Sequence, residues 1–131
     1  MNIALCILQS LLGLYFFLIG IIYFVIPPGL PAMMSWMYEL SPTLHSVSGT
    51  LEILGGLGLI LPSVTKIQPR LTPLAGAGLA LVMAGALTWH LQRGEPQNMF
   101  LNVILAVIAA SIAYGRWKLV PIQARGSNAA P

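Results

Sequence analysis

Four long apolar runs divide the chain, and short segments rich in proline and polar residues separate them. Each run approaches the roughly 20 apolar residues that an α-helix needs to cross a hydrocarbon core about 30 Å thick. Prolines lack an amide hydrogen and fix φ, so the prolines at the borders of the runs indicate where helices begin and end. We therefore predict membrane spans over about residues 3–26, 43–61, 72–91 and 97–114.

The segments between the runs carry local helix signals. Ser41-Pro42 and Thr72-Pro73 each pair an N-cap residue with proline at the first helical position. The longest connection, residues 28–40, is rich in methionine and aromatic residues, which favours a short helix in the lipid head-group region; an irregular loop is the alternative. We expect one domain over residues 1–118, followed by a disordered tail over 119–131, which lacks apolar periodicity.

Composition supports a membrane protein. Hydrophobic residues make up 57% of the chain and charged residues only 7%, whereas soluble domains carry roughly 25% charged residues to solvate their surface. So few charges cannot cover a water-exposed surface, and a lipid bilayer must cover most of this one. The predicted fold is all-α: an integral membrane four-helix bundle.

The positive charges lie mostly on one side of the predicted bundle. Only Arg93 lies on the opposite side. The remaining Lys and Arg residues are Lys66, Arg70, Arg116, Lys118 and Arg125. Cytoplasmic loops of membrane proteins carry an excess of Lys and Arg, so both termini are predicted to be cytoplasmic, in a bacterial inner membrane. Arg116 and Trp117 are then expected to anchor the last span at the inner interface.

Small residues predict how the helices pack, because helices in lipid associate through close contacts between small side chains. The first span has Gly13 and Gly20, seven residues apart. The other three spans show ridges at a spacing of four: Ser48, Glu52 and Gly56; Gly76, Ala80, Ala84 and Thr88; Asn98, Asn102, Ala106 and Ala110.

Glu52 is the residue that points most strongly to function. A charged side chain near the middle of a span costs about 2.5–3.5 kcal/mol on insertion scales, so it usually faces other helices and finds a partner there. No Lys or Arg lies inside a span to pair with it. The polar residues expected around it by depth are Tyr15, His90 and Asn102, with His45 and Asn98 toward the outer side. This cluster is either a hydrogen-bond network that fixes helix register or a ligand, quinone or proton site.

Other chemistries lack the residues they need. His45, His90 and Glu52 do not have the close spacing of metal motifs, so we expect neither a metal site nor a cofactor. The basic residues form no run or patch, which argues against a nucleic-acid partner. Cys6 is the single cysteine, so the chain cannot form an internal disulfide or a CxxC pair.

Several segments resemble the DoxX-like family of small four-helix membrane proteins. These are LEILGGLGLILP at 51–62, WHLQRGE at 89–95, Asn98 with Asn102, and AYGRW at 113–117. By position, Glu52, His90, Asn102 and Arg116 match the family pattern. The family takes its name from a small subunit associated with thiosulfate:quinone oxidoreduction, and other members look like partners of sulfur or oxidative-stress enzymes. No catalytic role follows from the resemblance.

Two functional hypotheses follow. In the first, the chain is a non-catalytic subunit or assembly factor of a membrane oxidoreductase system, quinone-linked in one version, with other oxidoreductase subunits as partners. In the second, it binds or converts a lipophilic molecule, a quinone or an isoprenoid, at an intramembrane site built on Glu52 and His90. The pattern leaves enzymatic activity open and is compatible with a homo-oligomer.

Overall fold

Helices account for most of residues 2–123, the part of the chain that the computed structural model describes. The elements in order are α1 (Asn2–Val25), η1 (Ala32–Glu39), α2 (Pro42–Thr65), α3 (Leu71–Arg93), α4 (Pro96–Tyr114) and η2 (Gly115–Leu119). Because every element in the described residues is a helix, the structure confirms the predicted all-α class. The four long helices are each long and apolar enough to cross a membrane. Of the predicted tail, residues 124–131 lie outside the described part of the chain.

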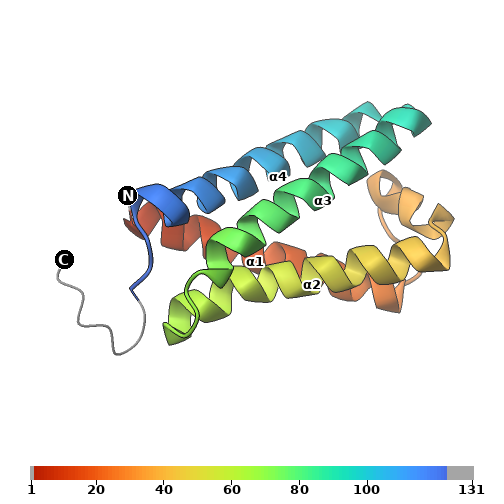
Figure 1. Cartoon of the computed structure of the whole chain (residues 1–131). Helices are drawn as coiled ribbons and strands as arrows, with labels where there is room; N and C mark the ends of the chain where they lie inside the picture. The colour runs from red at the N-terminus through yellow and green to blue at the C-terminus, as the bar shows by residue number, and fades with distance from the viewer. Residues whose placement is uncertain (1, 124–131) are drawn as a thin grey trace.

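The helices form two antiparallel hairpins, α1 with α2 and α3 with α4, that pack against each other (Figure 1). We call the end with η1 and the α3–α4 turn the η1 end, and the end with the start of α1, the α2–α3 turn and η2 the termini end. Figure 1 shows α2 and α3 close together near the termini end and diverging toward the η1 end, where η1, a 3-10 helix, folds back. A short helix in residues 28–40 agrees with the favoured prediction for this connection.

Glycines let α1 and α2 approach at two levels. A Cβ built on Gly56 would lie 2.5 Å from the carbonyl oxygen of Gly13, and one built on Gly20 would lie 2.9 Å from that of Gly49. Real Cβ atoms do not sit this close to backbone oxygens, so only glycine allows the contact. The predicted spacing of Gly13 and Gly20 is therefore used in packing.

The predicted ridges on α3 and α4 are only partly correct. Ala84 and Thr88 are exposed on α3, and Ala110 is exposed on α4. The buried faces instead follow Gly76, Leu79, Met83 and His90 on α3, and Asn98, Asn102, Leu105, Ala109 and Ile112 on α4. A spacing of four rotates by about 40° at each step in a helix of 3.6 residues per turn, so the later members of a ridge turn toward lipid.

Pro62 does not end α2 as expected, because a side chain of α3 compensates for its missing amide hydrogen. A proline inside a helix leaves the carbonyl four residues earlier without a donor. That carbonyl belongs to Gly58, and it accepts a hydrogen bond from Thr72 Oγ1 at 3.1 Å. The next carbonyl, of Leu59, accepts from Gln9 Nε2 at 2.9 Å. Such compensation allows proline within a helix in lipid.

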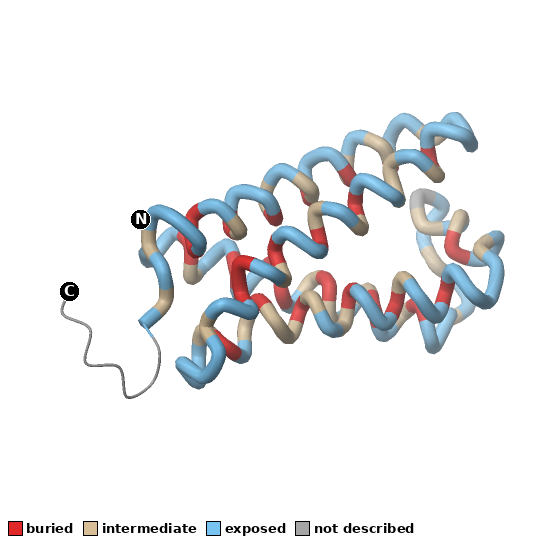
Figure 2. The backbone as a smooth tube through the Cα atoms, in the orientation of Figure 1, coloured by how far each residue is buried: buried red, intermediate tan, exposed pale blue. Residues whose placement is uncertain are grey.

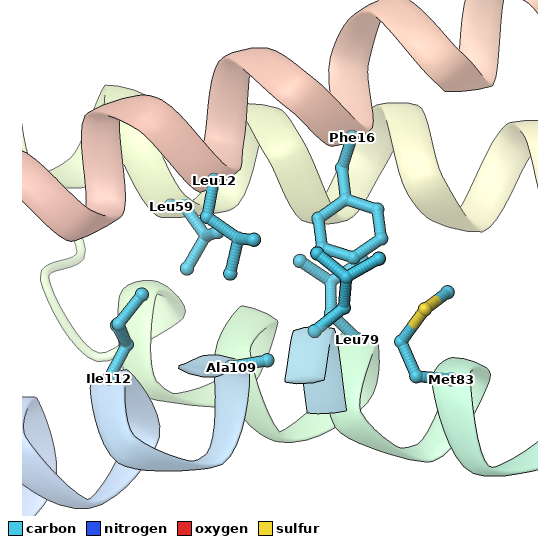
Figure 3. Close-up of a cluster of buried hydrophobic side chains, with 8 residues drawn as sticks. Leu12, Phe16, Leu59, Leu79, Met83, Ala109 and Ile112 are labelled. Carbon is cyan, nitrogen blue, oxygen red and sulfur yellow. The ribbon is translucent and has the colours of Figure 1, made fainter. Parts of the chain in front are cut away.

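Apolar side chains from all four long helices fill the middle of the bundle. Figure 3 shows Phe16 and Leu12 of α1 lying over side chains of α3 and α4. The cluster comprises Leu12, Phe16, Leu59, Leu79, Met83, Leu105, Ala109 and Ile112. Buried positions face the interior, whereas the outward faces are exposed (Figure 2) and carry many large apolar residues, as a lipid-facing surface does.

Candidate ligand cavity at the η1 end

A cavity of about 490 Å³ lies at the η1 end, lined by residues of η1 and of all four long helices. Small-molecule sites in proteins typically span about 300–1,000 Å³ and combine apolar walls with a few polar groups. The walls here are mostly apolar or aromatic. The hydrogen-bonding side chains that line it include Tyr15, Tyr23, Ser48, Glu52, His90, Asn98 and Asn102.

The cavity exists because α2 and α3 are in contact at one end only. Toward the termini end, a Cβ on Gly55 would lie 2.5 Å from Leu79 Cδ2, and a Cβ on Gly58 would lie 2.7 Å from Ala75 Cβ. These contacts hold the two helices close. Beyond them the helices diverge (Figure 1), and the cavity occupies the space between them.

The cavity reaches the outer surface between α2 and α3. Leu51, 45% exposed, lines it from α2 together with Leu44, which is also exposed. Gly85 lines it from α3; it is exposed, and a Cβ built there would meet nothing within 4 Å. These helix faces carry the large exposed apolar residues of a lipid-facing surface. A molecule dissolved in the membrane could therefore enter sideways.

Glu52 faces the interior of the bundle and is only 2% exposed. The phenol of Tyr23 lies beside its carboxyl group. Its Oε2 atom has no hydrogen-bond partner among the described residues. More than nine in ten buried polar groups in proteins do have a partner, so an unpaired carboxyl oxygen in the wall of a cavity needs an explanation.

Asn102 of α4 shows the same feature as Glu52. It is buried and lines the cavity, and its Nδ2 atom lacks a hydrogen-bond partner within residues 2–123. These two atoms, Glu52 Oε2 and Asn102 Nδ2, make up the buried side-chain nitrogen and oxygen atoms without a partner in that range. Both belong to the wall of one cavity.

His90 of α3 also lines the cavity, and its ring forms a hydrogen bond with Glu95 in the α3–α4 turn. The His90 Nδ1 and Glu95 Oε1 atoms are 2.9 Å apart, and Arg93 Nε donates to the same oxygen at 3.0 Å. Desolvation acts to raise the pKa of the Glu95 carboxyl, but the bonds from His90 and Arg93 outweigh it and lower that pKa below its ordinary value. An ionised Glu95 accepts the Nδ1 hydrogen, which leaves Nε2 as the ring nitrogen available to a ligand.

Aromatic side chains cover the cavity at this end. The Trp36 indole of η1 packs edge-to-face on the His90 ring, with centroids 4.9 Å apart, and lies 5.9 Å from the Trp89 ring. Arg93 adds two contacts: its guanidinium lies 4.6 Å from the centre of the Trp89 ring and forms an ion pair with Glu39 of η1. The contacts of Trp36 and the ion pair between Arg93 and Glu39 together hold η1 over the cavity.

Most of the predicted cluster lines this cavity, but His45 does not. Tyr15, Glu52, His90, Asn98 and Asn102 all belong to its wall. His45 is buried beside it: its Nδ1 lies 3.2 Å from the carbonyl oxygen of Tyr23, and the two rings pack edge-to-face. His45 therefore supports Tyr23. Within residues 2–123, no group of three His, Cys, Asp or Glu residues lies close enough to hold a metal ion.

Three aromatic or acidic residues of the site were missed by sequence reasoning. Tyr23 follows Tyr15 by eight residues, so a helical projection could have placed both on one face. Trp36 and Glu95 gave no such signal, because their positions depend on how η1 and the α3–α4 turn fold back over the bundle.

The two expected interface residues behave differently. Trp117 is 53% exposed, as an interfacial anchor would be. Arg116 is only 3% exposed, because its guanidinium group turns into the bundle at the termini end. Gly115 allows this, because a Cβ there would lie 2.9 Å from Leu5 Cδ2 and would push α4 away from α1.

The DoxX-like family model matches residues 7–112 of the chain. The chain belongs to this family, as its motifs indicated, and is a multi-pass membrane protein. The matched range includes Glu52, His90 and Asn102 and ends before Arg116. Neither the comparison with curated proteins nor the comparison with solved structures gave a match.

Proposed function

We propose that this protein binds a lipophilic small molecule whose oxygen atoms form hydrogen bonds with Glu52 and Asn102. The observation that carries the proposal is the pair of unpartnered polar atoms, Glu52 Oε2 and Asn102 Nδ2, in the wall of a largely apolar cavity. Leaving a buried polar group unpaired costs about 1–3 kcal/mol. A ligand that bonds to both atoms recovers that free energy on binding.

The two groups limit the chemistry of the ligand. Asn102 Nδ2 can only donate, so the ligand must offer an acceptor oxygen. The Glu52 carboxyl accepts when ionised and donates when protonated, so it suits a hydroxyl or a carbonyl. A quinone or an isoprenoid alcohol meets both requirements. His90 Nε2 accepts when Nδ1 carries the hydrogen, so it offers a further contact to a ligand hydroxyl.

The remaining walls favour a molecule that partitions into the bilayer. The opening between α2 and α3 lies on helix faces that bear exposed leucines. At the η1 end the cavity is bordered by Trp36 and Trp89, whose rings suit a flat head group. Of the two candidate ligands, a quinone fits these features better because its ring is planar.

Quenching of tryptophan fluorescence by a short-chain ubiquinone tests the proposal. In a Trp117→Phe background, the remaining tryptophans, Trp36 and Trp89, both line the cavity. We expect saturable quenching of the purified protein in detergent. Replacing Glu52 or Asn102 by Leu should weaken apparent affinity by about tenfold, since each change removes one hydrogen bond of about 1–2 kcal/mol.

Ser111→Ala is the matched control, because Ser111 lies on the exposed face of α4 and, among the residues that the structure describes, its hydroxyl bonds only to the Val107 carbonyl. This variant should bind as the parent does. Equal quenching in all variants would show that the quinone only partitions into micelles. The cavity would then have no role in quinone binding, and the subunit or assembly hypothesis would be favoured.

A further inference from the structure

A second unusual polar centre lies at the termini end, far from the η1-end cavity. Arg116, in the π-helical turn η2, donates from Nε to Gln9 Oε1 and from Nη1 to Asn2 Oδ1 at 2.7 Å. Nη1 also donates to the Val120 carbonyl at 3.0 Å, and Nη2 to Cys6 Sγ at 3.1 Å. All four acceptors are electrically neutral. One N–H of Nη2 has no acceptor among residues 2–123, since a guanidinium carries five.

No acidic residue compensates the charge of Arg116. The acidic residues of the chain are Glu39, Glu52 and Glu95, and none forms an ion pair with it in the described structure. Arginine stays protonated in proteins. A buried charge without a counter-charge is costly, above all in a membrane, and an anion beside it would lower that cost.

A second arginine lies beside the same space. A cavity of about 270 Å³ is lined by both Arg116 and Arg70, the latter from the α2–α3 turn. Arg70 is exposed and forms no ion pair with residues 2–123. The other walls are Pro69, Pro73, Trp117, Pro121 and Ile122, which are apolar or aromatic.

We infer that Arg116 and Arg70 bind the phosphate group of an anionic phospholipid. The exposed guanidinium group of Arg70 can offer paired N–H donors to phosphate oxygens, and Arg116 offers its remaining N–H together with its positive charge. The apolar walls suit the glycerol and upper acyl carbons, and the exposed Trp117 indole lies where interfacial tryptophans contact head groups. Free inorganic phosphate shares the charge and the oxygens but not the apolar part. This site does not depend on the ligand proposed for the η1 end.

Binding of dioctanoyl phosphatidylglycerol to the full chain in a neutral detergent, counted by native mass spectrometry, tests the inference. We expect saturable binding of one lipid to the parent protein. Arg70→Ala should weaken it about fivefold, the effect of removing one basic residue near a lipid phosphate. Because Arg70 is exposed and unpaired in the described structure, its loss should leave the fold intact.

Lys66→Ala is the matched control: Lys66 lies in the same turn and is exposed, but it does not line the cavity. It should bind like the parent. An equal loss in the Lys66 and Arg70 variants would reveal only general attraction to anions and would overturn the inference, as would unchanged binding in Arg70→Ala. Inorganic phosphate should compete poorly. If it binds while the lipid does not, the lipid assignment is wrong.

Discussion

Glu52 and Arg116 are both almost fully buried, and neither has a partner of opposite charge in the described structure, yet their surroundings differ. Arg116 uses four N–H groups on neutral acceptors, three of them side chains of α1. Glu52 leaves Oε2 unpaired beside a cavity of about 490 Å³. The comparison teaches that a buried charged residue can bond mostly to groups of the protein, or can leave a hydrogen-bonding atom open to a ligand. The unmet bonding is a whole carboxyl oxygen at Glu52, whereas at Arg116 it is limited to one N–H group.

The first way to break this comparison is to replace both residues by leucine. Arg116→Leu should lower the free energy of unfolding by about 2–4 kcal/mol, because the buried Gln9 loses the donor to its side-chain oxygen and the bonds to Asn2 and Cys6 are also lost. Glu52→Leu should leave stability unchanged or raise it, since an unpaired buried acid is removed. Denaturation in mixed micelles, followed by circular dichroism, measures both. Similar losses in the two variants would contradict the distinction.

The α2–α3 interface offers a second pair of positions to compare. Gly58 lies where the two helices are in contact, and Gly85 lies where they diverge beside the cavity. Gly58→Leu should cost about 1–3 kcal/mol, because Ala75 leaves no room for a side chain. Gly85→Leu should keep stability, since nothing lies within 4 Å, but should narrow the cavity and weaken quinone binding. Gly78→Leu, equally open but outside the cavity, is the control for binding.

Removing an aromatic side chain that covers the cavity should have a smaller effect, on the rate at which the ligand dissociates. Trp36→Ala removes edge-to-face contacts with His90 and Trp89, each worth about 0.5–1.5 kcal/mol beyond buried area. We expect the ubiquinone to dissociate several-fold faster, measured by stopped-flow recovery of Trp89 fluorescence in the Trp117→Phe background. An unchanged dissociation rate would show that η1 does not retain the ligand.

The smallest effect concerns pH at the η1 end. The bonds that Glu95 accepts lower its pKa below the ordinary 4.5, so they stabilise the fold fully above that pH. The contribution is lost as pH falls through the lowered pKa. Melting midpoints of the parent should therefore drop slightly between about pH 5 and 3, and the step should shrink in Glu95→Gln. Because the group is solvent-accessible, the change is small. A step of the same size in both proteins would show that a group other than Glu95 causes the drop in melting midpoint.

The sequence predicted the helical fold because apolar runs and their bordering prolines act locally. It also placed Glu52 inside the bundle, since a charge in lipid is costly. The partner of His90 was missed because Gly94, in the left-handed region at φ 68°, reverses the chain and returns Glu95 to the end of α3. The burial of Arg116 was not predicted because charge counting gives the side of a residue, not the direction of its side chain.

The interior of the η1 end was harder still to predict from sequence. Trp36 reaches His90 only because η1 folds back over the bundle, and such long-range contacts leave no periodic signal. His45 shows the reverse error: its depth suggested a place in the cluster, but its ring turns toward the backbone of Tyr23. Depth along a helix places a residue in a layer and says little about which neighbour it meets.

The most direct test is to identify what the protein carries from its own membrane. The full chain and its Glu52→Leu variant should be purified in parallel, extracted with organic solvent, and their lipophilic compounds quantified per protein by mass spectrometry. We expect one compound class bearing a carbonyl or hydroxyl at close to one molecule per chain in the parent, depleted about tenfold in the variant. Identical extracts from the two proteins would contradict a ligand site at Glu52.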